Sequence, residues 1–232
     1  MPSSIDFRRL RACGLFADAG PEVLSDLAGA CAEVEFLPGE AAFSAGDPAD
    51  HAFLVERGIV QVNRETTSGA NETIGLFGPG ELVALPAVLS VQLYPASVRA
   101  ASPAVAIRIP AVAFREALAR DTAISGALAV VMIEHVSRLR AKVFIVSAEG
   151  PSARIAALFL HLAERFGPPA SDPRVTLIPV VLPRATMAGL VSLRPETVSR
   201  VIARFRKEGV LSSVDEGFAV DPERLRRIEA AG

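Results

Sequence analysis

The chain has 232 residues, of which 50% are hydrophobic and 22% charged, so it has enough apolar material for one large or two modest domains. The net charge of −2 hides an asymmetry, because residues 1–150 carry a net charge of −5 and residues 151–232 one of +3. The acidic part is disfavoured as a nucleic-acid surface, which leaves the C-terminal part as the candidate for binding a polyanion.

No segment reads as a membrane anchor or a secretion signal. The longest apolar run, residues 124–133, is interrupted by Ser125 and Gly126 and is too short to span a bilayer. The first nine residues lack the apolar core and cleavage site of a signal peptide. Two cysteines, Cys13 and Cys31, also fit a reducing compartment, because secreted folds of this size usually carry several pairs. We therefore expect a cytoplasmic protein with no membrane partner.

In the N-terminal half, the residue pattern changes at Glu33 from helical to β-favouring. Residues 6–34 read as helical, with Pro21 at a first helical position. After them, short β-favouring runs alternate with glycine turns. The runs cover residues 34–37, 52–55, 59–62, 73–77 and 104–109, and the turns contain Gly39, Gly46, Gly58, Gly69, Gly78 and Gly80. Many short strands at this spacing predict a sandwich or β-roll.

A long helix is predicted from about residue 115 to residue 147. Five apolar residues on it are spaced by 4, 3, 4 and 3 positions, which is the seam of a two-stranded coiled coil. They are Met132, Val136, Leu139, Val143 and Val146. We interpret this helix as a homodimer interface; burial against the chain's own β-roll is the alternative. Residues 149–152 then form a hinge, residues 154–166 a further helix and residues 167–173 a loop.

Residues 184–207 predict two helices joined by a turn at residues 191–193. On the second helix, Glu196, Ser199 and Arg200 share one face, because residues three and four apart lie side by side on a helix. The opposite face is apolar, with Val198, Val201, Ile202 and Phe205. Arginine can donate two hydrogen bonds to a guanine edge, and a carboxylate can accept a hydrogen bond from the amino group of cytosine. A hydroxyl can form a hydrogen bond with either kind of base. This face therefore predicts base recognition in double-stranded DNA.

The surroundings of this helix support a DNA contact. Between residues 184 and 207 there are six basic residues against one acid, Glu196, as phosphate neutralisation requires. The candidate contacts to the DNA backbone are Arg184, Thr186, Arg194, Thr197, Arg204 and Lys207. Residues 210–220 contain two short apolar runs around an Asp-Glu-Gly turn and predict a hairpin, or wing. A solvated amphipathic helix of another helical domain is the alternative interpretation.

The second helix resembles the recognition helix of the Crp/Fnr family of bacterial transcription regulators. The Glu-x-x-Ser-Arg pattern of its Fnr branch occurs here as Glu196, Ser199 and Arg200. The cyclic-AMP branch has an arginine before the glutamate, where this chain has Pro195. The resemblance implies an inverted repeat of TTGAT-type half-sites. Ser192 departs from the family, which often has glycine at the turn, and a left-handed conformation there would cost about 1–2 kcal/mol.

The β-rich half is similar to the sensor domain of the same family, through its Leu-Pro-Gly-Glu and Ala-Gly-Asp-Pro phrases. The resemblance thus covers nearly the whole chain. It implies an α+β architecture of three parts: a cyclic-nucleotide-binding-like β-roll with N-terminal helices at 1–118, a dimerisation helix at 119–148, and a winged helix-turn-helix at 149–232. A regulator of this family implies RNA polymerase as a further partner.

The resemblance also places an effector pocket in the β-roll. Its candidate residues are Gly80, Glu81, Leu82, Tyr94, Pro95, Ala96 and Arg99. Tyr94 and Pro95 occupy the positions of the family's phosphate-binding Arg-Ser pair, so the main charge-assisted contacts to a phosphate are lost. Cyclic AMP is therefore not expected as the effector.

Two cofactors of the family require particular protein ligands. An iron-sulfur cluster needs four thiolates, which two cysteines per chain do not supply, so no cluster is expected. We interpret Cys13 and Cys31 as small buried hydrophobes, with a redox-active pair as the alternative. Residues 93–96 and 147–156 are similar to the nitrogen-oxide-responsive branches, some of whose members sense nitric oxide through haem. Among the histidines, His135 beside the dimer seam is the candidate metal ligand, and a structural histidine is the alternative.

Two other classes of function compete with a DNA-binding regulator. One is a regulator that binds a cyclic nucleotide or another small molecule, or a regulator that needs no effector. The other is an enzyme, but the sequence contains no Ser-His-Asp phrase, no Gly-x-x-x-x-Gly-Lys phosphate loop and no clustered metal ligands. Catalysis is not expected.

Overall fold

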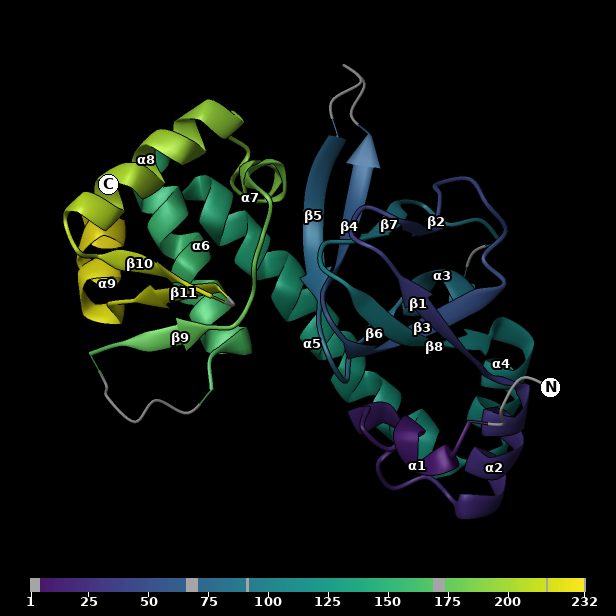
Figure 1. The fold of residues 1–232 in the computed structure, drawn as a ribbon. Coiled ribbons are helices and arrows are strands. Elements are labelled where there is room, and N and C mark those ends of the chain that lie inside the picture. The colour runs from purple at the N-terminus through teal and green to yellow at the C-terminus, as the bar shows by residue number, and fades with distance from the viewer. Residues whose placement is uncertain (1–4, 66–70, 91, 169–173, 216, 232) are drawn as a thin grey trace. The chain divides into compact units, whose positions relative to one another are not determined.

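The computed structural model describes residues 5–65, 71–90, 92–168, 174–215 and 217–231, which form two compact units (Figure 1). The first unit contains the described residues up to Glu65 together with residues 76–137. The second contains residues 71–75 and the described residues from Arg138 onwards. Helix α5 (Thr122–Ser147) and strand β5 (Asn71–Phe77) each run from one unit into the other.

Two four-stranded sheets form the β-roll of the first unit, in the orders β1-β8-β3-β6 and β2-β7-β4-β5. Besides β5, the strands are β1 (Ala32–Phe36), β2 (Ala41–Phe43), β3 (His51–Arg57), β4 (Val60–Glu65), β6 (Leu82–Val83), β7 (Ser97–Ala100) and β8 (Ala104–Pro110). Each β-favouring run of the sequence overlaps a strand, with Leu37 and Ile59 just outside β1 and β4. Strands β2 and β6 were not predicted, because two or three residues are too few to show a period.

Strands β3 and β8 are buried on both faces, which explains why they read as continuous apolar runs. Along β3, Phe53 and Val55 point into the roll, whereas Ala52 and Leu54 face a second core formed with the helices. On β8, Ala106 likewise points into the roll and Ile107 faces the second core. The roll therefore has one core between its sheets and another against its helices.

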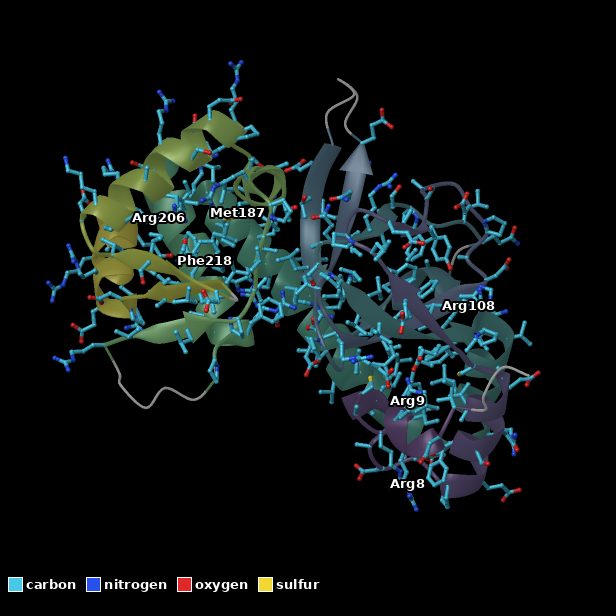
Figure 2. All side chains as sticks on the ribbon, viewed as in Figure 1. Arg8, Arg9, Arg108, Met187, Arg206 and Phe218 are labelled. Carbon is cyan, nitrogen blue, oxygen red and sulfur yellow. The ribbon has the colours of Figure 1, made fainter. Side chains whose placement is uncertain are left out.

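The helices of the first unit pack against that second core. They are α1 (Phe7–Leu10), the 3-10 turn Gly14–Phe16, α2 (Pro21–Ala30), α3 (Leu85–Ser90) and α4 (Ala111–Arg120). Phe16 and Phe114 meet edge to face in it, with ring centroids 6.2 Å apart. Arg9, labelled in Figure 2, joins α1 to the sheet through ion pairs with Glu33 and Glu56.

The predicted helix from residue 115 to residue 147 is interrupted at Asp121, so that prediction was wrong in its first part. Asp121 has an extended backbone between α4 and α5. One carboxylate oxygen accepts from the backbone N–H of Ala123 at 2.8 Å, and the other accepts from Gly20 at 2.8 Å. Because these N–H groups have no partner within their helices, Asp121 caps the starts of both α5 and α2.

The second unit is a helical domain with a three-stranded sheet in the order β10-β11-β9. Its elements are α6 (Gly150–Phe166), β9 (Thr176–Ile178), α7 (Arg184–Val191), α8 (Pro195–Lys207), β10 (Leu211–Val214), β11 (Gly217–Val220) and α9 (Pro222–Ala230). Helix α6 begins four residues earlier than predicted, because Pro151 suits a first turn that needs no N–H donor. The predicted loop at 167–173 lies largely outside the described residues. Strand β9 and helix α9 were not predicted.

Phe159, Phe205 and Phe218 anchor the core of the second unit. Phe159 and Phe205 are fully buried, and the rings of Phe159 and Phe218 meet edge to face with centroids 5.0 Å apart. Figure 2 labels Phe218 and Met187, which lie within the domain. Gly217 allows β11 to approach β9, because a Cβ there would lie 2.0 Å from the carbonyl oxygen of Ile178. The hairpin predicted at residues 210–220 is confirmed by the pairing of β10 with β11.

Both cysteines lie in the core that joins the roll to its helices. Burial raises the pKa of Cys13 to about 11 and that of Cys31 to about 12. A raised pKa keeps the thiol protonated below that pH, so almost no thiolate is present at pH 8. We expect iodoacetamide to alkylate neither cysteine of the native protein at pH 8, and both after unfolding in urea. Rapid native labelling of Cys13, detected by mass spectrometry, would contradict the interpretation as buried hydrophobes.

Candidate nucleic-acid interface

Helices α7 and α8 are joined by a tight turn whose central residue is Ser192. Its backbone is left-handed, with φ 51° and ψ 49°, and the N–H of Leu193 donates to the carbonyl oxygen of Ala188 at 3.0 Å. This is the conformation for which glycine is the usual residue. The Ser192 hydroxyl donates to Glu72 at 2.8 Å. Pro195 then occupies the first turn of α8, where its missing N–H costs nothing.

Helix α8 has one buried and one exposed face, as its sequence predicts. Val198, Val201, Ile202 and Phe205 are buried in the second unit. Glu196, Ser199 and Arg200 are all exposed. The Arg200 guanidinium also donates to the Thr197 hydroxyl at 3.3 Å, one turn earlier. The three side chains therefore offer a cation, a carboxylate and a hydroxyl to solvent from adjacent turns of a helix that is anchored on its other side.

The candidate backbone contacts fall into different environments. Arg194, Arg204 and Lys207 are exposed, and Thr197 is partly buried. Arg184 is partly buried, and this burial lowers its pKa, with a smaller contribution from Arg206. Thr186 is only 4% exposed, so its proposed contact to DNA finds no support in this structure. Residue 186 points inward because α7 packs with that face on the domain core, which the sequence pattern alone did not reveal.

Two serines that the sequence analysis did not single out hold the basic side chains of α8. The Arg204 guanidinium donates to the Ser152 hydroxyl of α6 and also pairs with Glu208 at 3.8 Å. Arg206, labelled in Figure 2, donates to the Ser213 hydroxyl of β10. These bonds join α8 to the hinge end of α6 and to the wing. A lone serine carries no sequence signal for such a role, because its partner lies elsewhere in the chain.

The predicted effector residues of the β-roll form hydrogen bonds with other residues of the same domain. The Glu81 carboxylate accepts from the N–H of Gly78 at 2.7 Å, and exposed Arg99 donates to the carbonyl oxygen of Gly39 at 3.2 Å. Gly80 donates its N–H to Val55 at 2.8 Å, and Leu82 pairs with β3. None of these contacts aims a cation into the roll. They do not form the donor set that a phosphate requires.

Tyr94 fills part of the β-roll interior. It is 4% exposed, and its ring stacks on Phe43 with centroids 3.7 Å apart. Its hydroxyl donates to the carbonyl oxygen of His51 at 2.6 Å and accepts from the His51 N–H at 3.1 Å. Burial raises the pKa of Tyr94, so the phenol stays neutral. A neutral phenol with both hydrogen bonds made therefore occupies the position that the resemblance assigns to the family's phosphate-binding arginine.

A cavity of about 240 Å³ opens beside Tyr94, and of the predicted effector residues only Tyr94 lines it. The other lining residues are Val34, Phe36, Ala42, Phe43, Asp47, Pro48, Asp50, His51, Phe53 and Arg108. Burial lowers the pKa of His51, as does the nearby cation of Arg108, so the imidazole is neutral at pH 7. The cavity is smaller than the roughly 300–1,000 Å³ of ordinary ligand pockets. His51 has the chemistry of a haem ligand, and haem would need a larger cavity than this one.

His135, the candidate metal ligand, is partly buried and lies 6.4 Å from Phe77 between ring centroids. No group of three or more metal-ligating side chains occurs among the residues that the structure describes. The contact seen for His135 is with the aromatic ring of Phe77.

The long helix α5 carries an exposed apolar stripe. Val136, Leu139 and Val143 of the predicted seam are 54%, 48% and 60% exposed, whereas Met132 and Val146 are partly buried. Three further apolar residues are exposed beside them, namely Val130, Ile133 and Phe144. The apolar surface is thus displaced toward Ile133, because Met132 packs against the chain's own core.

Among the described residues, α5 is also the one helix whose length and composition would allow it to cross a bilayer. The apolar side chains of α5, however, share the helix with Glu134, Arg138, Arg140 and Lys142. A lipid-exposed helix is apolar on all sides, whereas a protein interface needs only a stripe. The pattern favours contact with another protein helix.

Comparison with known proteins gives two domain matches that together cover most of the chain. The family model of the cyclic nucleotide-binding domain matches residues 33–121. The family model of the Crp-like helix-turn-helix domain matches residues 153–228. The first match coincides with the β-roll and α4, and the second with α6 to α9.

Known relatives are distant and match three quarters or more of the chain. A CRP-like cAMP-activated global transcriptional regulator of Mycobacterium tuberculosis is 23% identical over 94% of this chain and 97% of its own length. The transcriptional activator protein anr of Pseudomonas aeruginosa is 26% identical over 75% of this chain and 70% of its own. The structure of FixK2 from Bradyrhizobium japonicum superposes with a TM-score of 0.74 at 17% identity, covering 87% of this chain and 98% of that one. The last comparison shows the fold alone. With an effector-domain β-roll followed by a DNA-binding helix-turn-helix, the chain belongs to the Crp/Fnr family of transcription regulators.

Proposed function

We propose that this regulator acts as a homodimer that reads an inverted repeat of TTGAT-type half-sites with helix α8. The observation that carries the proposal is the exposed row of Glu196, Ser199 and Arg200, which lies opposite the face that anchors α8 in its domain. Arg200 is suited to a guanine edge, Glu196 to the amino group of cytosine, and Ser199 to either kind of base. Contacts to base edges of this kind provide the sequence preference.

Contacts to phosphate would set the register of α8 in the major groove. Arg194, Arg204 and Lys207 are exposed at the start and end of the helix, whereas Thr197 of α8 and Arg184 of α7 are partly buried. Such contacts carry most of the affinity and its dependence on salt, but little sequence information. RNA polymerase, as the partner of a DNA-bound regulator, remains a prediction.

The homodimer part of the proposal rests on α5. An inverted repeat requires two recognition helices about one DNA turn, ~34–36 Å, apart and related by twofold symmetry. The exposed stripe around Val136 and Val143 is apolar and continuous over at least two helical turns. A second copy of the same helix would cover it with matching spacing.

The β-roll is proposed to bind an effector other than cyclic AMP. Tyr94 replaces the cation that a phosphate needs, and its hydroxyl is already bonded to His51. Haem with nitric oxide, suggested by the short similarity at residues 93–96, remains a candidate that would need a larger cavity than the one beside Tyr94. An effector acts by binding one orientation of the reading helices better than the other. A regulator without an effector is the alternative.

Fluorescence anisotropy with three duplexes tests this function: an inverted TTGAT repeat, an inverted TGTGA repeat and a scrambled sequence of equal length. We expect the wild-type protein to bind the TTGAT repeat about 10³-fold or more tightly than the scrambled duplex at physiological salt. Addition of cyclic AMP should leave all three affinities unchanged. Equal or tighter binding to the TGTGA repeat would overturn the half-site assignment, and tightening by cyclic AMP would overturn the assignment of the effector.

A further inference from the structure

Lys142, in the C-terminal half of α5, has its ammonium group inserted between two other elements of the second unit. It donates to the carbonyl oxygens of Gly189 at 2.6 Å and Leu190 at 2.8 Å, and to that of Thr73 at 3.1 Å. The first two carbonyls belong to the last turn of α7 and the third to β5. An ammonium group has three N–H donors, so these contacts use all of them.

A carboxylate completes this cluster, which we name the Lys142 cluster and which comprises Lys142, Glu72, Thr73, Gly189 and Ser192. Glu72 lies 3.4 Å from the Lys142 ammonium and accepts the Ser192 hydroxyl bond at 2.8 Å. The side chain of Lys142 is 15% exposed, and burial lowers its pKa while Glu72 opposes that effect. The Ser192 bond, more than Lys142, lowers the pKa of Glu72. The ion pair with Glu72 thus opposes the effect of burial on Lys142.

The cluster satisfies a helix end and a turn together. The last carbonyls of a helix have no partner within it, and the negative end of the helix dipole favours a cation there. Lys142 supplies that cation to α7, and Glu72 accepts the hydroxyl hydrogen bond of Ser192, the left-handed central residue of the turn toward α8. Gly189 permits the close approach, because a Cβ at this position would lie 2.7 Å from the backbone nitrogen of Thr73.

The choice of lysine at this position is informative. The chain contains 22 arginines and only two lysines, Lys142 and Lys207. Arginine presents its donors in a planar fork, whereas an ammonium is compact and directs its three donors apart. Three carbonyl oxygens converging from two elements match the ammonium geometry. Positive charge alone does not explain a lysine here.

We propose that Lys142 is a positioning residue for the recognition helix: by capping α7 against β5 and α5, it fixes the direction in which α8 is presented. This inference rests on the proposed DNA-reading function and deepens it by naming a control point. Both supports of α7 are continuous with the effector domain, because β5 continues there at Leu76 and α5 begins there at Thr122. A change in the position of β5 or of α5 would therefore shift α7.

Hydrogen exchange without DNA tests the packing step. We compare Lys142→Met, which keeps the aliphatic stem, with Arg226→Met, which removes an exposed charge from α9. Lys142→Met should speed exchange in residues 71–75 and 184–193 together, while Arg226→Met should change neither segment. Lys142→Arg should behave as Lys142→Met does. Unchanged exchange in Lys142→Met, or full protection in Lys142→Arg, would overturn the role given to the ammonium.

Anisotropy with the inverted TTGAT repeat tests the positioning step, using duplexes whose half-sites are moved one or two base pairs apart. Lys142→Met should weaken binding to the best spacing about tenfold or more and flatten the preference among spacings. Binding to the scrambled duplex should stay within about twofold of wild type, because phosphate contacts are intact. Equal losses on both DNAs indicate a purely structural role and contradict the inference, as does an unaltered spacing preference. If the wild type ignores the repeat while Lys142→Met still loosens both segments, the proposed function fails and the packing role of Lys142 is supported.

Discussion

Replacing Val136 and Val143 together by glutamate is expected to convert the protein from a dimer into monomers. These side chains lie one heptad apart on α5 and are 54% and 60% exposed in the single chain. Covering an apolar side chain of this size contributes about 1.5–3 kcal/mol, and the change affects both helices of a twofold interface. The new carboxylates would also face one another across the seam. Sedimentation velocity at micromolar concentration measures the outcome.

Loss of the dimer should carry over to DNA. Two linked recognition helices bind a repeat about 10²–10⁴-fold more tightly than one, because the second contact is intramolecular. The double variant should therefore bind the full repeat no better than a single half-site. Glu134→Gln is the matched control, because it changes an exposed charge on the same helix outside the apolar stripe. A double variant that remains dimeric, with full affinity for the repeat, would place the dimer interface elsewhere.

Replacing Arg200 by alanine is expected to abolish most discrimination at one guanine of each half-site. The guanidinium is exposed on α8 and is steadied by Thr197 at 3.3 Å, so truncation leaves the helix anchored by its buried face. Loss of a bidentate contact costs about 1–3 kcal/mol per half-site and should relax specificity at that base pair alone. Affinity for duplexes with each base substituted in turn measures this directly.

Lys207→Ala is the comparison that separates base reading from charge. Lys207 is exposed at the end of α8, where a phosphate contact is proposed. Its removal should weaken repeat and scrambled duplex alike and lower the slope of log affinity against log salt by about 1. If Arg200→Ala instead weakened all sequences equally, Arg200 would contact phosphate, and the base-reading role would pass to other residues of the helix.

The sequence was most informative where a period and a chemical pattern coincide over several residues. The two faces of α8 follow from spacing alone, because any helix places residues three and four apart together. The turn at Ser192 and the wing hairpin were likewise predictable, since local backbone preferences and alternating apolar residues specify them. The apolar runs at residues 52–55 and 104–109 predicted strands β3 and β8, whereas their burial on both faces was found only in the fold.

Contacts between residues far apart in the chain could not be predicted from the sequence. Asp121 ends α4 and caps α5 and α2, yet its signal within a continuous helical pattern is one carboxylate. Thr186 resembles a surface hydroxyl in sequence and is buried in the fold. Which apolar residues of α5 remain exposed also depended on the core beneath it, because Met132 packs inward while Ile133 does not.

The sequence by itself predicted the helix pair and the two faces of α8, because amphipathic period and side-chain chemistry act within one or two turns of the chain, whereas the three-part architecture followed from the family resemblance. Only the tertiary structure decided how the exposed face of α8 is positioned. Lys142, Glu72 and Ser192 are separated by 50 to 120 positions, and only folding brings the ammonium, the carboxylate and the hydroxyl within 3.4 Å of their partners. A cation finds its carbonyls through packing, which no local pattern encodes.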